Sequence, residues 1–149
     1  KQLELHLDLY GQVDIKYKNR FEELCRENSA FITYKGSISF GKSIDILKNY
    51  TALLFPTYYD GEGLAGIFID AMAAGIPVIA SDWHANKEII KDGYNGLIVP
   101  THNLSELQDA IIKLVENNEL VLELKKNCLH EVEKYEPSNA LQVIFDQLR

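Results

Sequence analysis

Two acidic residues, Glu62 and Asp70, are separated by seven residues in a stretch rich in glycine. Gly61, Gly63 and Gly66 surround Glu62, and glycine lets a backbone turn tightly and approach a ligand without a Cβ clash. An ionised carboxylate only accepts hydrogen bonds, and it can accept two from a diol. The pattern therefore predicts a loop carboxylate and a helix carboxylate that face the same ligand.

A predicted strand, loop, helix and strand between residues 52 and 81 place this acidic pair. The apolar run 52–55 is short and continuous, as is typical of a parallel strand buried on both faces. A helix is predicted from about 66 to 74, with Gly75 as its cap, and a second buried strand follows over 77–80. In such units ligands bind beyond the carboxyl ends of the strands, which is where Glu62 would lie.

The first turn of this predicted helix suits an anion. The free N–H groups of Gly66 and Ile67, with the positive end of the helix dipole, favour a phosphate. Helical side chains lean toward the N-terminus of their helix, so Asp70 is expected to point at the same ligand. A ligand with both phosphate and hydroxyl groups is a nucleotide sugar. The alternative is that Glu62 only offsets the helix dipole and Asp70 is a solvated helix residue.

The stretch EGLAGIFIDAMAAGIPVIASDWHANKEIIKDGYNGLIVP resembles the donor-binding motif of the family 4 retaining glycosyltransferases of the GT-B fold. That family has a Glu, seven residues, a second Glu, an Ala- and Gly-rich helix end, a PVIA strand, a Glu-Ile-Ile segment and an Asn-Gly pair. The similarity is continuous over 52–100. The residues of this stretch are most like those of members that build bacterial capsular or lipopolysaccharide chains. It implies a Rossmann-like α/β fold, with a mostly parallel sheet of about five strands, flanking helices and a helical C-terminal tail.

The resemblance also implies roles for individual residues. It places Glu62 at the donor sugar as the catalytic residue, and Asp70 at the position that holds the ribose hydroxyls. Because Asp is shorter than Glu by one carbon–carbon bond, about 1.5 Å, either the helix lies closer to the ribose or a water bridges the gap. The implied donor is a UDP- or GDP-linked sugar, with no cofactor and no metal. The donor-binding residues are Gly63, Leu64, Ala65, Gly66, Ile67 and Asp70.

Further loops are expected on the same edge of the sheet. Gly36 and Ser37 belong to the strand-to-helix loop 36–40, near which the resemblance would place the base. Trp83 and His84 are candidates to line the pocket, although a loop Trp commonly just packs against its neighbours. Glu88 is a candidate to support the site, or simply an acid at a helix end.

The rest of the chain alternates strands and helices. Ser105 and Gln108 fit a capping box for the first of the later helices. Strands are predicted over 3–10, 31–34 and 97–99, and helices over 15–27, 42–49, 88–90, 105–117 and 119–133, with a last helix from 137 onward.

The composition limits the classes of partner. A net charge of −7 with no basic cluster argues against nucleic acid or an anionic membrane surface. Cys25 and Cys128 lack the spacing of a metal site, so reduced, buried thiols in a cytosolic protein are expected. With 46% hydrophobic residues, the 149-residue chain has enough apolar material for a core.

The resemblance further implies that residues 1–149 are part of a carboxyl-terminal donor domain that begins at its second strand. The first strand and helix, with a basic pair for the pyrophosphate, would be absent. So would the domain that binds a carbohydrate or lipid-linked acceptor. We therefore expect no sugar transfer by this chain alone, and a whole protein that is cytoplasmic or peripheral at the inner face of the membrane.

The absent strand would be central in the usual order 3-2-1-4-5-6. Its loss should leave the strands near residues 3 and 52 with unpaired edges. We expect either a closed-up five-stranded sheet or an intermolecular contact there, as in a homo-oligomer.

Two other classes of function remain open at this stage. A GT-B-fold epimerase would share the fold and the nucleotide sugar, but would use catalytic acids that this chain does not display. A non-catalytic α/β interaction module would use the same glycines and acids structurally. An epimerase would form product from the nucleotide sugar without an acceptor. An interaction module would have no affinity for nucleotides.

Overall fold

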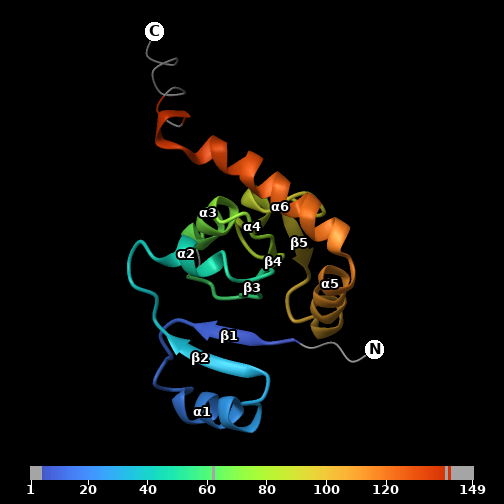
Figure 1. Ribbon diagram of the computed structural model, residues 1–149. Helices are drawn as coiled ribbons and strands as arrows, with labels where there is room; N and C mark the ends of the chain where they lie inside the picture. Colours follow the sequence, from blue (N-terminus) through green and yellow to red (C-terminus); the bar gives the residue numbers. More distant parts are fainter. Residues whose placement is uncertain (1–4, 62, 140, 142–149) are drawn as a thin grey trace. The chain divides into compact units, whose positions relative to one another are not determined.

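The computed structural model describes residues 5–61, 63–139 and 141. Strands and helices alternate along the chain, as Figure 1 shows. The chain divides into two compact units, residues 1–42 and 43–149, and each is described here by itself. Among the described residues, no helix combines the length and the apolar character that a membrane crossing requires.

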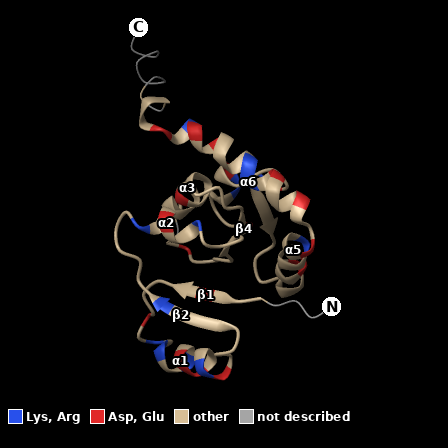
Figure 2. Ribbon diagram, viewed as in Figure 1, with Lys and Arg blue, Asp and Glu red and all other residues tan. Residues whose placement is uncertain are grey.

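The first unit contains two parallel strands and one helix. Strand β1 (Leu7–Tyr10) pairs with β2 (Ile32–Gly36), and the register shifts by one residue after Leu9. Helix α1 (Lys18–Glu27) connects them and has Lys or Arg interspersed with Glu along its surface (Figure 2). This helix begins three residues later than the sequence predicts, because 11–17 form a loop.

The second unit contains a three-stranded parallel sheet in the order β3-β4-β5. Its strands are β3 (Leu53–Phe55), β4 (Val78–Ser81) and β5 (Gly96–Val99), and its helices are α2 (Ser43–Leu47), α3 (Gly66–Ala73), α4 (Asn86–Ile89), α5 (Leu104–Glu116) and α6 (Asn118–Val132), followed by the short 3-10 helix η1 (Glu133–Tyr135). The predicted βα order is confirmed, because each short apolar strand is followed by a loop and then by a helix. Proline closes β3 and β5, at Pro56 and Pro100.

Strand β4 lies at the centre of the sheet and all four of its residues are buried. Successive side chains of a strand point to opposite faces. Accordingly, Val78 and Ala80 belong to one hydrophobic cluster, with residues of α3 and α4, while Ile79 belongs to another, with residues of α5 and β5. The sheet is therefore covered on both faces, which is why its strands are apolar throughout.

Helix α3 ends as the sequence predicts. Gly75 has φ +67°, a left-handed conformation that glycine adopts without penalty. The N–H of Gly75 donates to the carbonyl of Met72 at 2.9 Å, and that of Ile76 donates to the carbonyl of Ala71 at 2.8 Å. These two bonds are a Schellman motif, which satisfies the last carbonyls of the helix.

The described strands do not form the closed-up five-stranded sheet that was one of our expectations. They form one sheet of two strands and one of three, and β1 and β3 are each the end strand of their own sheet. Helices α1, α3 and α4 each connect two strands that are hydrogen-bonded to each other. Strands β2 and β3, on either side of α2, are not paired. The alternative expectation, an intermolecular contact at these edges, remains a prediction.

The predicted capping box of α5 is wrong. Asn103 is the N-cap, and its side chain accepts a hydrogen bond from the N–H of Glu106 at 3.2 Å. Asparagine caps helices as well as serine does, so the helix begins before Ser105. Residues 137–139 are helical as expected, but Ala140 and 142–149, which the predicted last helix includes, lie outside the described residues.

Candidate functional site

The carboxyl ends of three parallel strands define one edge of the second unit. Strand β3 ends at Phe55, β4 at Ser81 and β5 at Val99. Phe55 pairs with Ala80, and Ser81 pairs with Val99, so the three strands end almost level. The loops that follow therefore emerge together, at the edge where α/β sheets bind ligands.

Hydrogen bonds tie the loop after β3 to the loop after β4. The Ser81 hydroxyl donates to the carbonyl of Thr57. The indole Nε1–H of Trp83 donates to the carbonyl of Tyr59 at 2.9 Å. Both bonds fix the backbone of the segment that leads from β3 toward α3. Trp83 is therefore half-buried and holds the loop, whatever else it contacts.

Aromatic rings gather at this edge. The Tyr58 and His102 ring centroids lie 4.2 Å apart, and those of Trp83 and His84 lie 4.6 Å apart. Both histidines are exposed and have a positive φ, +43° at His84 and +58° at His102. The left-handed region is uncommon for residues with a side chain, so these two loops turn tightly without glycine.

Two buried asparagines brace α4 behind the loop. The Asn86 side-chain amide donates to the carbonyl of Ser81 at 3.0 Å. Asn95 accepts from the N–H of Lys91 at 2.7 Å and donates to the carbonyl of Ile89 at 3.0 Å. Asn95, the asparagine of the Asn-Gly pair in the family motif, thus also holds α4. Glu88, by contrast, is exposed on α4, and a site-supporting role for it stays a prediction.

The N-terminus of α3 faces the same loops without a side-chain cap. Its N-cap residue is Ala65, with φ −75° and ψ 100°, and the first turn contains no acidic residue. Gly63 and Gly66 are exposed, Leu64 is exposed and Ala65 is buried. The first N–H groups of the helix are thus available to an anion. Glu62, the predicted catalytic residue, lies outside the described residues.

Asp70 lies in the middle of α3 and is half-buried. Its Oδ2 accepts a hydrogen bond of 2.5 Å from the hydroxyl of Ser43, the first residue of α2. The predicted ribose-binding carboxylate is therefore not a freely solvated helix residue. Within the described residues, no group of three or more His, Cys, Asp or Glu side chains is placed to hold a metal ion.

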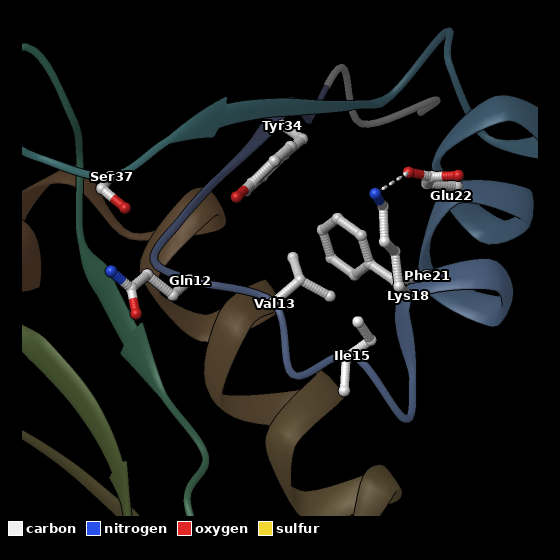
Figure 3. Close-up of a pocket in the computed structure, with 8 residues that line it drawn as sticks. All are labelled: Gln12, Val13, Ile15, Lys18, Phe21, Glu22, Tyr34 and Ser37. Carbon is white, nitrogen blue, oxygen red and sulfur yellow. Dashed lines mark ion pairs between the residues drawn. The ribbon is translucent and has the colours of Figure 1, made fainter.

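The first unit has a cavity of its own, of about 460 Å³ (Figure 3). Its walls come from the loop after β1, the near side of α1 and the end of β2. The Phe21 and Tyr34 rings meet edge to face with centroids 5.0 Å apart, and the Tyr34 hydroxyl donates to the carbonyl of Gly11 at 2.7 Å. Of the two loop residues predicted here, Ser37 lines the cavity and Gly36, with φ +77°, makes the turn beside it. The lining residues are Gln12, Val13, Ile15, Lys18, Phe21, Glu22, Tyr34 and Ser37.

Sequence reasoning missed Ser43, Tyr58 and His102. Ser43 carries one weak signal, since serine favours the start of a helix, but nothing near it in sequence points to Asp70, 27 residues away. Tyr58 and His102 come from different loops, and only the parallel order of β3, β4 and β5 brings them together.

Comparison with known proteins assigns the family. The parallel strands, their connecting helices and the ligand-side loops define an α/β domain of the Rossmann-like type. The profile of the family described as "Glycosyl transferases group 1" matches residues 1–130. The chain therefore belongs to this family of glycosyl transferases.

Individual relatives agree with this assignment. The chain is 35% identical over 89 residues to an uncharacterized glycosyltransferase of Methanocaldococcus jannaschii, covering 60% of this chain and 22% of that protein. It is 27% identical over 142 residues to the poly(ribitol-phosphate) alpha-N-acetylglucosaminyltransferase of Staphylococcus aureus, covering 94% of this chain and 28% of that protein. The chain thus spans less than a third of either relative.

A solved structure has the same fold. Sucrose-phosphate synthase from Thermosynechococcus elongatus superposes with a TM-score of 0.79 and 27% identity, over 96% of this chain and 37% of that chain. The predicted fold class is confirmed by this similarity, and the predicted family by the profile match.

Proposed function

We propose that this chain binds the nucleotide-sugar donor of a glycosyltransferase, which moves the sugar from a nucleoside diphosphate to a hydroxyl group. One observation carries this proposal. Helix α3 begins without a side-chain cap at the carboxyl edge of a parallel sheet, and it presents a carboxylate, Asp70, four residues beyond Gly66. Backbone N–H donors for a phosphate and a carboxylate acceptor for hydroxyl groups, on one helix, match the two polar parts of a nucleotide sugar.

Each part of the donor has a proposed contact. The diphosphate lies at the N–H groups of Gly66 and Ile67, and the ribose hydroxyls donate to Asp70. The loop from Gly63 runs along the sugar, and Glu62 faces the sugar as the catalytic residue. In this arrangement the protein orients the donor and stabilises the charge on the leaving phosphate. No protein nucleophile is required.

The neighbouring loops complete this proposal. Trp83 and His84 form the wall after β4, and their position is fixed by the bond from Trp83 to the Tyr59 carbonyl. Glu88 supports that wall from α4. The donor is a UDP- or GDP-linked sugar that binds without a metal or a further cofactor.

The whole protein is proposed to act in the synthesis of a bacterial cell-surface polysaccharide, such as a capsule or lipopolysaccharide. The Staphylococcus aureus relative, which is named for a poly(ribitol-phosphate) acceptor, supports a polymeric acceptor. In this proposal the chain is the carboxyl-terminal donor domain, and the carbohydrate or lipid-linked acceptor binds to another domain of the whole protein.

Ligand-observed NMR tests the donor proposal. The full-length protein, with any sequence that flanks these 149 residues, is mixed in turn with UDP, GDP, ADP and UDP-glucose. One of the nucleotides is expected to bind. Asp70→Ala is expected to lower the affinity for it at least tenfold, because a hydrogen-bonded charge is removed. Asp45→Ala is the matched control: Asp45 is an exposed acid in the first turn of α2, so its loss should leave binding unchanged.

Two results would contradict the proposal. Absence of binding by every nucleotide would favour a non-catalytic interaction module. Binding that leads to an altered nucleotide sugar without any acceptor would favour an epimerase.

A further inference from the structure

Ser43 and Asp70 form a side-chain pair that joins the start of α2 to the middle of α3. Ser43 is the first residue of α2 and Asp70 lies on α3, 27 residues later. The Ser43 hydroxyl donates to Asp70 Oδ2 at 2.5 Å, and both residues are half-buried. The pair is therefore held by its own hydrogen bond and is partly open to a ligand.

The hydrogen-bonding capacity of this pair is not exhausted by its internal bond. An ionised carboxylate has about four acceptor positions, and a hydroxyl that donates once still has two lone pairs that accept. The pair thus presents only acceptors to a ligand, distributed over a carboxylate and a neighbouring hydroxyl oxygen. Two adjacent hydroxyl groups, which both donate, are the matching ligand chemistry.

We propose that Ser43 and Asp70 together bind the vicinal diol of the donor's ribose. One ribose hydroxyl donates to the Asp70 carboxylate, and the other donates to Ser43 Oγ, whose own O–H continues to donate to Asp70 Oδ2. This inference rests on the proposed function, since it names a second residue for the ribose. It assigns Ser43 a direct contact with the donor.

The pair also accounts for the short side chain at position 70. An aspartate carboxylate reaches about 1.5 Å less far than that of a glutamate, the length of one carbon–carbon bond. The Ser43 hydroxyl donates to the carboxylate, and this bond polarises its oxygen into a better acceptor beside Asp70. A serine and an aspartate thereby cover the diol that a single longer carboxylate would otherwise reach.

Deoxynucleotides isolate this contact. Isothermal titration calorimetry on the full-length protein compares the ribonucleoside diphosphate that binds best with its 2′-deoxy and 3′-deoxy analogues. Ser43→Ala is expected to weaken binding of the ribonucleotide roughly tenfold, the upper end of what a neutral hydrogen bond contributes. The analogue that lacks the hydroxyl bound by Ser43 should bind to the variant and to the wild type equally.

Two further variants separate a direct contact from a structural role. Ser43→Thr keeps the hydroxyl and should keep most of the ribonucleotide affinity. Ser43→Ala combined with Asp70→Glu should recover affinity, because the added methylene supplies the missing reach. A structural role predicts no recovery, since the longer side chain would then only disturb the start of α2.

The outcomes distinguish this inference from the proposed function. Only the inference is overturned if Ser43→Ala lowers the affinity for the ribonucleotide and for both deoxy analogues equally. The same holds if Ser43→Ala leaves all three affinities unchanged while Asp70→Asn abolishes binding. If the wild-type protein binds no nucleoside diphosphate, the proposed function is overturned, and the inference with it.

Discussion

The surroundings of Asp70 on α3 and of Glu131 on α6 show two ways of placing a carboxylate in one fold. Glu131 is only 3% exposed. Its Oε1 accepts from Lys91 Nζ at 2.7 Å, and Lys134 Nζ donates to both of its oxygens at 2.9 and 2.8 Å. Asp70 is half-buried, and the bond that it accepts from Ser43 comes from a neutral hydroxyl.

The difference separates a structural carboxylate from one that suits a ligand. Two ammonium groups donate three hydrogen bonds to Glu131 and neutralise its charge, so it joins α6 to the segment after α4. Burial alone would raise the pKa of Glu131, but hydrogen bonds and charge from Lys134 and Lys91 lower it below its usual range. The partner of Asp70, by contrast, is a hydroxyl that can itself accept a hydrogen bond.

Replacing Glu131 should give the largest loss of stability. Glu131→Gln keeps the shape but removes the charge-assisted bonds, and we expect it to lower the free energy of unfolding by about 2 kcal/mol. Chemical denaturation measures this change. Glu123→Gln, at an exposed position of the same helix, is the matched control and should have little effect. Equal losses in both variants would show that the bonds to the two lysines contribute nothing.

The stability should depend on pH through the same residue. The folded-state pKa of Glu131 lies below its ordinary value of 4.5. Its contribution is therefore fully present above pH 4.5 and is lost as the pH falls through the folded-state pKa. The melting temperatures of wild type and Glu131→Gln should converge on acidification below pH 4.5. A gap that stays constant as the pH falls further would contradict this account of the pKa.

Gly75 tests the end of α3 that faces α6. A Cβ at this position would lie 3.4 Å from the Leu129 side chain, and the residue has φ +67°. Gly75→Ala should cost about 1 kcal/mol for the left-handed backbone, with no further loss at Leu129, because 3.4 Å is an ordinary van der Waals contact. Gly93→Ala is the control, because Gly93 has φ +70° and open space around it. Denaturation should therefore show similar losses at Gly75 and Gly93, and a clearly larger loss at Gly75 would contradict this account of the Leu129 contact.

Trp83 should show the smallest effect on stability. Trp83→Phe removes the bond from Nε1 to the Tyr59 carbonyl but keeps an aromatic ring, so we expect a loss of about 0.5 kcal/mol. Tyr59→Phe serves as the control, since Tyr59 contributes only its backbone to this bond. Differential scanning calorimetry of the two variants measures the loss of stability. Nucleotide binding is the second readout, and a lower affinity in Trp83→Phe alone would show that the bond also shapes the site.

The regular elements were predictable because local signals agree. Apolar runs such as 52–55 are closed by proline or glycine, and Gly75 stops α3 both by conformation and by capping. The N-terminal boundaries were less certain where two caps compete, as Asn103 and Ser105 show. The division into two sheets was not predicted, because strand pairing depends on contacts between distant segments.

The site was predictable only in part. The glycines and Asp70 were singled out because their spacing is local, and their roles, like those given to Glu62 and Glu88, stay predictions. The bonds that distinguish the two carboxylates link residues 27 and 40 positions apart. No periodicity or motif specifies such bonds, so Ser43 and the lysines around Glu131 emerge only from the structure.

The most direct test of the account measures both carboxylates by the same two methods. Asp70→Asn and Glu131→Gln each remove one charge, and each variant is examined by chemical denaturation and by titration with the nucleoside diphosphate that the wild type binds. The account predicts a crossed result: Asp70→Asn loses nucleotide affinity and keeps its stability, whereas Glu131→Gln loses stability and keeps its affinity. Unchanged affinity in Asp70→Asn, or equal losses of affinity in both variants, would contradict the assignment of α3 as the donor-binding helix.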